Sequence, residues 1–234
     1  MKKWSIFGAL SAIALVLGVL VVRTTGEDSA HAQTANAEDI AEAGDTRQMD
    51  EILRIRSLIR NDPVAPTIAP QGHDITIVMF SDYQCPYCRK VHPIVDTLME
   101  EDPKIRLVYR DWPIFGAAST EAARAAIAST YQDKQAAFHD ALMTMSGKLT
   151  SQGIRTAANK AGVDWNRLQS DLKTHSADID GAIGRTREYA AMMGLSGTPG
   201  FLVGPYMIPG AVDLGGLREA VAAARANPDA IAAE

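Results

Sequence analysis

The stretch that decides the fold reads ITIVMFSDYQCPYC and runs from Ile75 to Cys88. Its first six residues are apolar or β-branched, which predicts a short buried strand. Its last four form a Cys-Pro-Tyr-Cys tetrad, in which Pro86 suits the first turn of a helix because proline has no N–H group to lose. The stretch therefore predicts a strand that leads into a helix, with a thiol pair at the junction.

Cys85 and Cys88 are the only cysteines of the chain. Disulfide exchange proceeds by attack of a thiolate on sulfur, so the attacking cysteine has to be ionised and exposed. The unpaired N–H groups and the dipole of a helix N-terminus favour an anion, which makes Cys85 the predicted nucleophile. Cys88 lies one turn further along the same side and could attack a mixed disulfide at Cys85. The tetrad thus predicts a redox-active pair.

Two other interpretations of the pair are weaker. A structural disulfide would close so small a loop that its entropic stabilisation would be slight. Half of a zinc site would need two further ligands, and the chain has no other cysteine. His92 follows Cys88 by four residues, so a soft-metal site of two thiolates and one imidazole is conceivable, but His92 is more simply a histidine on a helix surface. We predict no metal site and no cofactor.

The N-terminus carries an export signal. Lys2 and Lys3 precede the apolar run Phe7–Val22, and an Ala-His-Ala sequence at residues 30–32 resembles a cleavage site. Residues 1–32 are therefore a signal peptide or, alternatively, an uncleaved anchor through residues 6–22, because that run approaches the roughly 17–20 residues that span a bilayer. Both alternatives place the remaining chain outside the cytoplasm. The net charge of −5, without a dense basic run, argues against nucleic acid as a partner.

Residues 33–64 are predicted to be a linker followed by a short amphipathic helix. The small, polar and Ala-rich composition of residues 24–48 is typical of a linker. From Met49 to Ile59 the apolar residues recur at helical spacing, and Asn61-Asp62-Pro63 stops the helix. This helix either docks on the main domain or serves as an oligomerisation segment. Residues 63–72 are interpreted as a Pro-rich connector.

The rest of the chain alternates between the two kinds of secondary structure. A second strand at Ile105–Tyr109 completes a strand–helix–strand unit and predicts a parallel sheet. Residues 115–193 are predicted to form three or four helices. The later segments are two strands and a final helix, at Gly200–Val203, Tyr206–Ile208 and Leu214–Ala226. Before the first of these strands stands Thr198-Pro199, where a cis peptide bond is often found.

Three motifs together resemble the DsbA-like thioredoxin family, the exported bacterial thiol-disulfide oxidoreductases. They are FSDYQCPYC at residues 80–88, Gly-Thr-Pro-Gly at residues 197–200 and Arg-Asp-Trp-Pro-Ile at residues 110–114. The resemblance covers about residues 65–226. It implies an α/β fold, namely a thioredoxin fold with an inserted all-helical subdomain at about residues 115–193, preceded by the N-terminal signal or anchor and the short helix.

The resemblance also implies roles for individual residues. Cys85 matches the nucleophile and Cys88 the resolving thiol. Thr198 and Pro199 match the cis-proline loop, whose backbone pairs with an extended substrate segment. The sequence departs from the family's strong oxidase at Met79, where that oxidase carries a buried glutamate, so proton handling during exchange is expected to differ.

The residues that tune the pair favour one direction of exchange. Pro86 and Tyr87 between the cysteines, and Thr198 before the proline, look more like the periplasmic isomerases and the ScsC-type proteins linked to copper tolerance than like the strong oxidase. The resemblance implies a periplasmic isomerase or reductase that acts on exported proteins, exchanges electrons with a membrane redox partner and could form homo-oligomers through residues 49–60. The alternatives are a dithiol oxidase and a copper-binding protein.

Overall fold

The structure is a computed structural model that describes residues 37–227. The chain divides into two compact units between Gly44 and Asp45, and the sheet belongs to the second unit. Within the described residues, this one mixed sheet has the strand order β1-β3-β2-β4-β5. The strands are β1 (Thr67–Ile68), β2 (Ile75–Ser81), β3 (Ile105–Asp111), β4 (Gly200–Val203) and β5 (Tyr206–Pro209).

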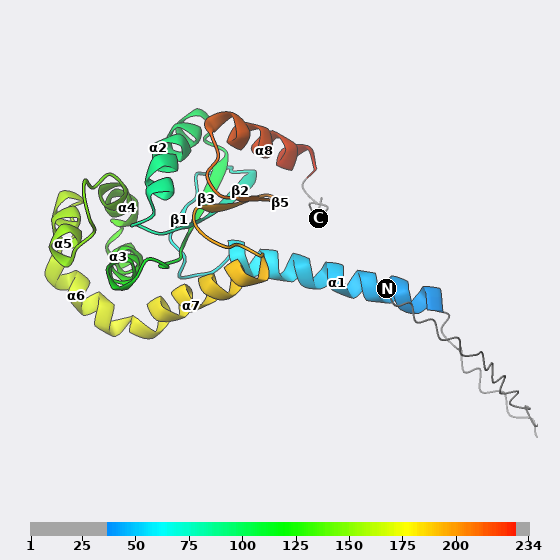
Figure 1. Cartoon of the computed structure of the whole chain (residues 1–234), viewed down its shortest axis with the longest axis horizontal. Coiled ribbons are helices and arrows are strands. Elements are labelled where there is room, and N and C mark those ends of the chain that lie inside the picture. Colours follow the sequence, from blue (N-terminus) through cyan, green and yellow to red (C-terminus); the bar gives the residue numbers. More distant parts are fainter. Residues whose placement is uncertain (1–36, 228–234) are drawn as a thin grey trace, which may run out of the picture. The chain divides into compact units, whose positions relative to one another are not determined.

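The helices of the described chain follow in sequence order (Figure 1). They are α1 (Ala37–Arg60), α2 (Pro86–Glu101), α3 (Ala117–Ala128), a 3-10 turn (Ser129–Gln132), α4 (Gln135–Met143), α5 (Ser151–Lys160), α6 (Trp165–Thr174), α7 (Ser176–Met192) and α8 (Leu214–Ala226). The parallel pairing of β2 with β3 across α2 confirms the predicted strand–helix–strand unit. β4 pairs antiparallel with β2, and β5 pairs antiparallel with β4.

Both faces of the sheet are covered, which explains why β2 is a continuous apolar run rather than an alternating one. On one face, Ile77 and Met79 pack against α2 and α8. On the other face, Val78 and Phe80 pack against Ile59 at the end of α1 and against α7. Successive residues of a strand point to opposite faces, so odd-numbered residues of β2 and β3 face α2.

Helices α3 to α7 form the predicted helical insertion, which has five α-helices within the described residues where the sequence predicted three or four. Its core is rich in small side chains from α3, such as Ala122 and Ala126, with Phe138 and Leu142 from α4. In Figure 1, α3, α4, α5 and α6 lie together beside the sheet, while α2 and α8 lie on another side of the strands. The same cluster of buried residues includes both cysteines, so the thiol pair lies where the insertion meets the strand–helix–strand unit.

Three segments differ from the sequence prediction. Within the predicted helical region 115–193, the chain is interrupted between α3 and α4, because Asp133 adopts a left-handed conformation (φ 55°) and ends the 3-10 turn before α4. The Pro-rich connector contains β1, which pairs with β3. Helix α1 begins at Ala37, within the segment interpreted as linker. The predicted signal or anchor, including residues 6–22, lies outside the described residues, and none of the described helices has the length and apolarity needed to cross a bilayer.

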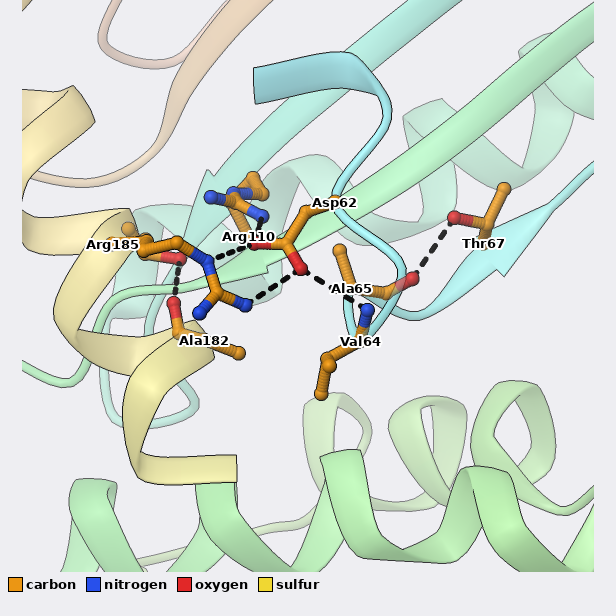
Figure 2. A network of polar contacts seen from close by, with 8 residues as sticks. Asp62, Val64, Ala65, Thr67, Arg110, Ala182 and Arg185 are labelled. Carbon is orange, nitrogen blue, oxygen red and sulfur yellow. Dashed lines mark hydrogen bonds and ion pairs between the residues drawn. The ribbon is translucent and has the colours of Figure 1, made fainter. Parts of the chain in front are cut away.

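The end of α1 is held by a buried ion network around Asp62 (Figure 2). Arg110 of β3 donates to the Asp62 carboxylate at 2.7 Å, and Arg185 of α7 donates two hydrogen bonds at 2.8 Å. Burial alone would raise the pKa of Asp62, but the hydrogen bonds from Arg185 and Arg110 outweigh it and hold that pKa at about 2. Asp62, which lies in the predicted helix stop at residues 61–63, therefore links the end of α1 to β3 and α7.

Candidate active site

Cys85 lies at the N-terminus of α2, as predicted. It is the N-cap residue, and Pro86 is the first residue of the helix. The Cys85 N–H group donates to the carbonyl oxygen of Asp82 at 3.0 Å, and the Arg89 N–H group donates to the Cys85 carbonyl at 3.1 Å. Both cysteines are free thiols. The local sequence thus positions two thiols within one turn of a helix start.

The cis-proline loop reaches the same place from the other end of the chain. The Thr198–Pro199 peptide bond is cis, and the Cys85 thiol donates to the Thr198 carbonyl oxygen at 3.2 Å. Burial raises the pKa of Cys88 well above that of an ordinary thiol, while the nearby Asp82 backbone and Thr198 side chain act in the opposite direction. The structure therefore brings together Cys85, the predicted nucleophile, and a loop that lies 113 residues further along the sequence.

The expected exposure of the nucleophile is wrong for this structure. Cys85 is only 1% exposed and Cys88 is fully buried, because the helical insertion and the Thr198 carbonyl cover them. The two residues between them, Pro86 and Tyr87, are exposed, and Tyr87 has 61% of its surface accessible. The two residues that the sequence predicts to tune the pair are therefore accessible, whereas the thiols themselves are buried.

Asp82 ties the strand-to-helix turn to the loop after β3. Its carboxylate accepts hydrogen bonds from the Gln84 N–H group and the Ser119 hydroxyl, both at 2.7 Å. It also accepts from the N–H groups of Ile114 and Phe115, at 2.7 Å and 3.1 Å. Four donors occupy this buried carboxylate, so its role is to hold the two loops beside the thiols together.

A second buried carboxyl lies nearby without such partners. Asp111 is the last residue of β3, and apart from the neighbouring Tyr83 hydroxyl its oxygens have no hydrogen-bond partner within the described part of the chain. Burial raises the pKa of Asp111 to about 7, against the opposing effect of the neighbouring Tyr83 hydroxyl. The Tyr83 hydroxyl lies 3.0 Å from Nδ1 of His139, whose pKa burial lowers to about 3. The sequence alone did not point to a role for Asp111, although an acidic residue at the end of an apolar strand is a visible signal.

His92 is not the surface histidine that the sequence suggested. It is 5% exposed, and its Nε2 atom lies 3.1 Å from Asp140 and 3.3 Å from Asp96. Its ring packs against that of His139, with the centroids 5.3 Å apart. Among the described residues, the group of potential ligands around His92 comprises Asp96 and Asp140 and includes neither cysteine. The structure therefore does not bring His92 together with the thiols as a soft-metal site.

Comparison with known families gives one match over most of the second unit. The family described as DSBA-like thioredoxin domain matches residues 76–222. This range includes both cysteines, the helical insertion, the cis-proline loop and most of α8. It is more than half of the chain.

Solved structures resemble the fold along almost their whole length. A thioredoxin-like oxidoreductase from Silicibacter pomeroyi is 42% identical, covers 73% of this chain and 98% of its own, and has a TM-score of 0.70. The thiol-disulfide exchange protein alpha-DsbA2 from Wolbachia pipientis is 27% identical, covers 77% and 97%, and has a TM-score of 0.70. A periplasmic thioredoxin-like protein from Salmonella enterica is 28% identical, covers 74% and 97%, and has a TM-score of 0.64.

Curated relatives match through one part of a longer protein. The Na(+)/H(+) antiporter NhaA 1 of Salinispora arenicola is 30% identical over 168 residues, which are 68% of this chain and 24% of the antiporter. The antiporter NhaA 3 of Salinispora tropica is 30% identical over 155 residues, or 59% and 22%. The chain therefore spans about a quarter of the length of these relatives.

Proposed function

The chain belongs to the DsbA-like thioredoxin family, and from this membership we propose that it is a thiol-disulfide oxidoreductase that reduces and isomerises disulfides of exported proteins. One observation carries the proposal. Cys85 is a free thiol at the start of α2, and its Sγ atom lies 3.2 Å from the Thr198 carbonyl of the cis-proline loop. A helix N-terminus favours the thiolate, and the adjacent loop offers backbone groups to an extended substrate.

The proposed exchange has two steps. The Cys85 thiolate attacks one sulfur of a substrate disulfide, forms a mixed disulfide and releases the other substrate sulfur as a thiolate. Cys88 then attacks Cys85, which releases the substrate reduced and leaves the pair oxidised. If a substrate thiol attacks the mixed disulfide first, a new substrate disulfide forms and Cys85 is regenerated, which is isomerisation. Exposed apolar side chains at Tyr87, Ile114 and Phe115 support contact with unfolded segments.

The direction of electron flow follows from the tuning residues. Pro86 and Tyr87 in the tetrad, with Thr198 before Pro199, are the choices that resemble isomerases and reductases rather than the strong oxidase. This direction requires the pair to be kept reduced. Alkylation trapping in cells tests it, since a mostly reduced pair supports reduction and isomerisation, whereas a mostly oxidised pair would assign the protein to the oxidases.

The proposed location is the periplasm, where the chain is either free after cleavage within residues 1–32 or tethered by residues 6–22. The charge pattern of the N-terminus supports export. The partner that keeps the pair reduced would then be a membrane-bound thiol reductase. Fractionation of cells that produce the full chain, with and without residues 1–32, tests the location, because a periplasmic protein is lost from that fraction when its signal is removed.

Helix α1 supports a second copy of the chain as a partner. Its last turn docks on the sheet through the fully buried Ile59, whereas Met49 and Leu53 are 43% and 48% exposed. Exposed apolar residues one turn apart are typical of a helix that packs against another helix. Light scattering should give a lower mass for the double variant Met49→Lys, Leu53→Lys than for the native chain. Met207→Lys, on β5, is the matched control for an exposed methionine.

Insulin reduction tests the proposed activity itself. With dithiothreitol as the electron source, the native protein should accelerate precipitation of the insulin B chain. The substitution Cys85→Ser should abolish this acceleration. Ser170→Ala, which changes an exposed serine of α6, provides a control for handling and folding. Full activity in Cys85→Ser would show that another group carries the reaction.

A further inference from the structure

A histidine and two carboxylates from two different helices converge at a point separate from the thiol pair. His92 and Asp96 lie four residues apart on α2, a spacing that places both on one face of the helix. Asp140 lies on α4, in the helical insertion. The Nε2 atom of His92 is 3.3 Å from a carboxylate oxygen of Asp96 and 3.1 Å from one of Asp140. One nitrogen and two oxygens, all within 4.8 Å of one another, therefore surround a single small space.

An ion pair accounts poorly for these distances. A charge-assisted hydrogen bond between an imidazolium and a carboxylate is about 2.7–2.9 Å long. A ring nitrogen of histidine carries either one proton or one lone pair. Nε2 of His92 instead has two carboxylates beside it, and both distances exceed that range. One proton on Nε2 does not bind both carboxylates at full strength.

The same distances fit the edges of a metal coordination shell. Zn²⁺ binds an imidazole nitrogen at about 2.0–2.1 Å and a carboxylate oxygen at about 2.0–2.2 Å. Nitrogen and oxygen atoms at those radii, separated by 3.1 Å and 3.3 Å, subtend angles of about 95–105° at the metal. Tetrahedral and octahedral shells have angles of about 109° and 90°. A cation can therefore contact Nε2 and both carboxylates with little movement of the side chains.

The burial and the charge of the three groups also favour a cation. The His92 side chain is only 6% exposed, and among the described residues its Nε2 atom has no polar partner other than the two carboxylates. Neither Asp96 nor Asp140 forms an ion pair with a lysine or arginine of the described chain. Burial raises the pKa of Asp96, and the negative charges of Asp140 and Glu100 act in the same direction. A buried nitrogen is thus aimed at two carboxylates that have no basic side chain as counter-charge.

We propose that His92, Asp96 and Asp140 bind a divalent transition-metal cation of the zinc type. Imidazole nitrogen suits zinc and similar metals, whereas magnesium and calcium favour oxygen ligands alone. Asp96 and Asp140 have 48% and 54% of their side chains exposed, so the ion can enter from solvent and keep water as a further ligand. The sequence predicted no metal site, since Asp140 lies 48 residues from His92 and no local pattern joins them.

The bound cation joins the helix that carries the thiols to the helical insertion. Cys88 lies one turn before His92 on α2, and α4 contributes Phe138 and Leu142 to the buried cluster that contains Cys88. A metal held by both helices favours the folded state, because the unfolded chain does not present the three ligands together. The cation has a structural role and takes no part in the exchange of electrons at Cys85.

Metal binding is measured on protein without thiolates, because thiolates bind zinc themselves. Native protein with Cys85 and Cys88 oxidised to a disulfide meets this condition, and the double variant Cys85→Ser, Cys88→Ser meets it without oxidation. Each is freed of metal with a chelator, dialysed against Zn²⁺ at neutral pH and analysed by atomic emission. We expect one zinc ion per chain in both. Zinc should also move the midpoint of urea unfolding to a higher concentration.

Substitution of the exposed carboxylates identifies the ligands. Asp140→Asn and Asp96→Asn keep the size of the side chain, and both positions are about half exposed, so we expect the variants to fold. Each should weaken zinc binding by at least about 100-fold, because loss of an outer partner of a metal ligand already costs about 10–100-fold. Asp133→Asn changes an exposed aspartate just before α4 and is the matched control, with native affinity expected.

The possible outcomes separate the site from other modes of binding. Loss of zinc in Asp140→Asn and Asp96→Asn, with retention in Asp133→Asn, supports the site. Absence of zinc from both thiolate-free forms overturns the inference, even if the reduced protein binds zinc through its thiols. Native affinity in Asp140→Asn and Asp96→Asn overturns it as well. Displacement of zinc by an equal concentration of Mg²⁺ contradicts the assignment to a transition metal. None of these results depends on the exchange activity of Cys85.

Discussion

Substituting Asp62 by asparagine removes the charge at the centre of the buried network that joins α1, β3 and α7 (Figure 2). The native pKa of Asp62 is about 2, against an ordinary value of 3.8. Each unit of difference corresponds to about 1.4 kcal/mol, so ionised Asp62 contributes about 2 kcal/mol to folding. The variant also leaves the guanidinium of Arg110 buried without a counter-charge, which adds to the cost. We expect Asp62→Asn to lower the free energy of unfolding at pH 7 by between about 2 and 4 kcal/mol.

The pH dependence gives this prediction a definite sign. Because the folded-state pKa of Asp62 is depressed, its contribution is complete above about pH 4 and is lost as the pH falls toward 2. The difference in stability between the native protein and Asp62→Asn should therefore shrink over that interval. Urea unfolding followed by circular dichroism at 222 nm measures both quantities, provided that the slope with denaturant stays unchanged.

An exposed ion pair supplies the control. Arg218 and Glu101 are 2.6 Å apart, but their side chains are 53% and 42% exposed. Glu101→Gln should cost less than about 1 kcal/mol, because solvent screens such pairs. The reasoning would be refuted if Asp62→Asn unfolded within about 0.5 kcal/mol of the native protein at pH 7, since a buried network of this geometry is expected to exceed that value.

Three further stability changes follow from the structure, each measurable by the same urea titration. Burial raises the pKa of Asp111 to about 7, so its ionisation disfavours the folded state. Asp111→Asn should therefore stabilise the fold by up to about 4 kcal/mol above pH 7 and not at all below pH 4. Equal stability of the native protein and Asp111→Asn at pH 9 would contradict this. Tyr83→Phe should cost about 1–2 kcal/mol by leaving Nδ1 of His139 without its partner, and no loss would mean that this hydrogen bond is not formed. Ile59→Ala should cost about 3 kcal/mol because the side chain is fully buried, whereas the exposed Leu53→Ala should be nearly neutral, and similar costs for the two would show that the end of α1 does not dock.

Local sequence predicted most of what positions the thiols. The apolar run at residues 75–80, the proline at position 86 and the second apolar run at residues 105–109 are each read from neighbouring residues, and the strand–helix–strand unit follows from their order. The same holds for the Thr198-Pro199 motif, whose place before a strand predicted a cis bond that the structure has. These features depend on backbone preferences that a short segment carries by itself.

Features that depend on contacts between distant segments were not predicted. The sequence indicated only that Asp62 belongs to a helix stop, because its partners Arg110 and Arg185 lie 48 and 123 residues away. The sequence predicted that His92 lies on the surface of its helix, because the helical insertion that covers it comes later in the chain. The burial of Cys85 has the same cause, since the cis-proline loop lies 113 residues further on. Hydrophobic periodicity reports which face of an element is buried, but it does not report what covers that face.

The most direct test of the exchange mechanism is the identity of the cysteine that substrates capture. Cys88→Ser, produced as the full chain in cells and isolated after acid quenching, should carry other proteins in mixed disulfides, and peptide mapping should place every such bond on Cys85. Cys85→Ser should carry none. Mixed disulfides on Cys88 in Cys85→Ser, or no captured protein in Cys88→Ser, would contradict the assignment of Cys85 as the nucleophile of a thiol-disulfide exchange site.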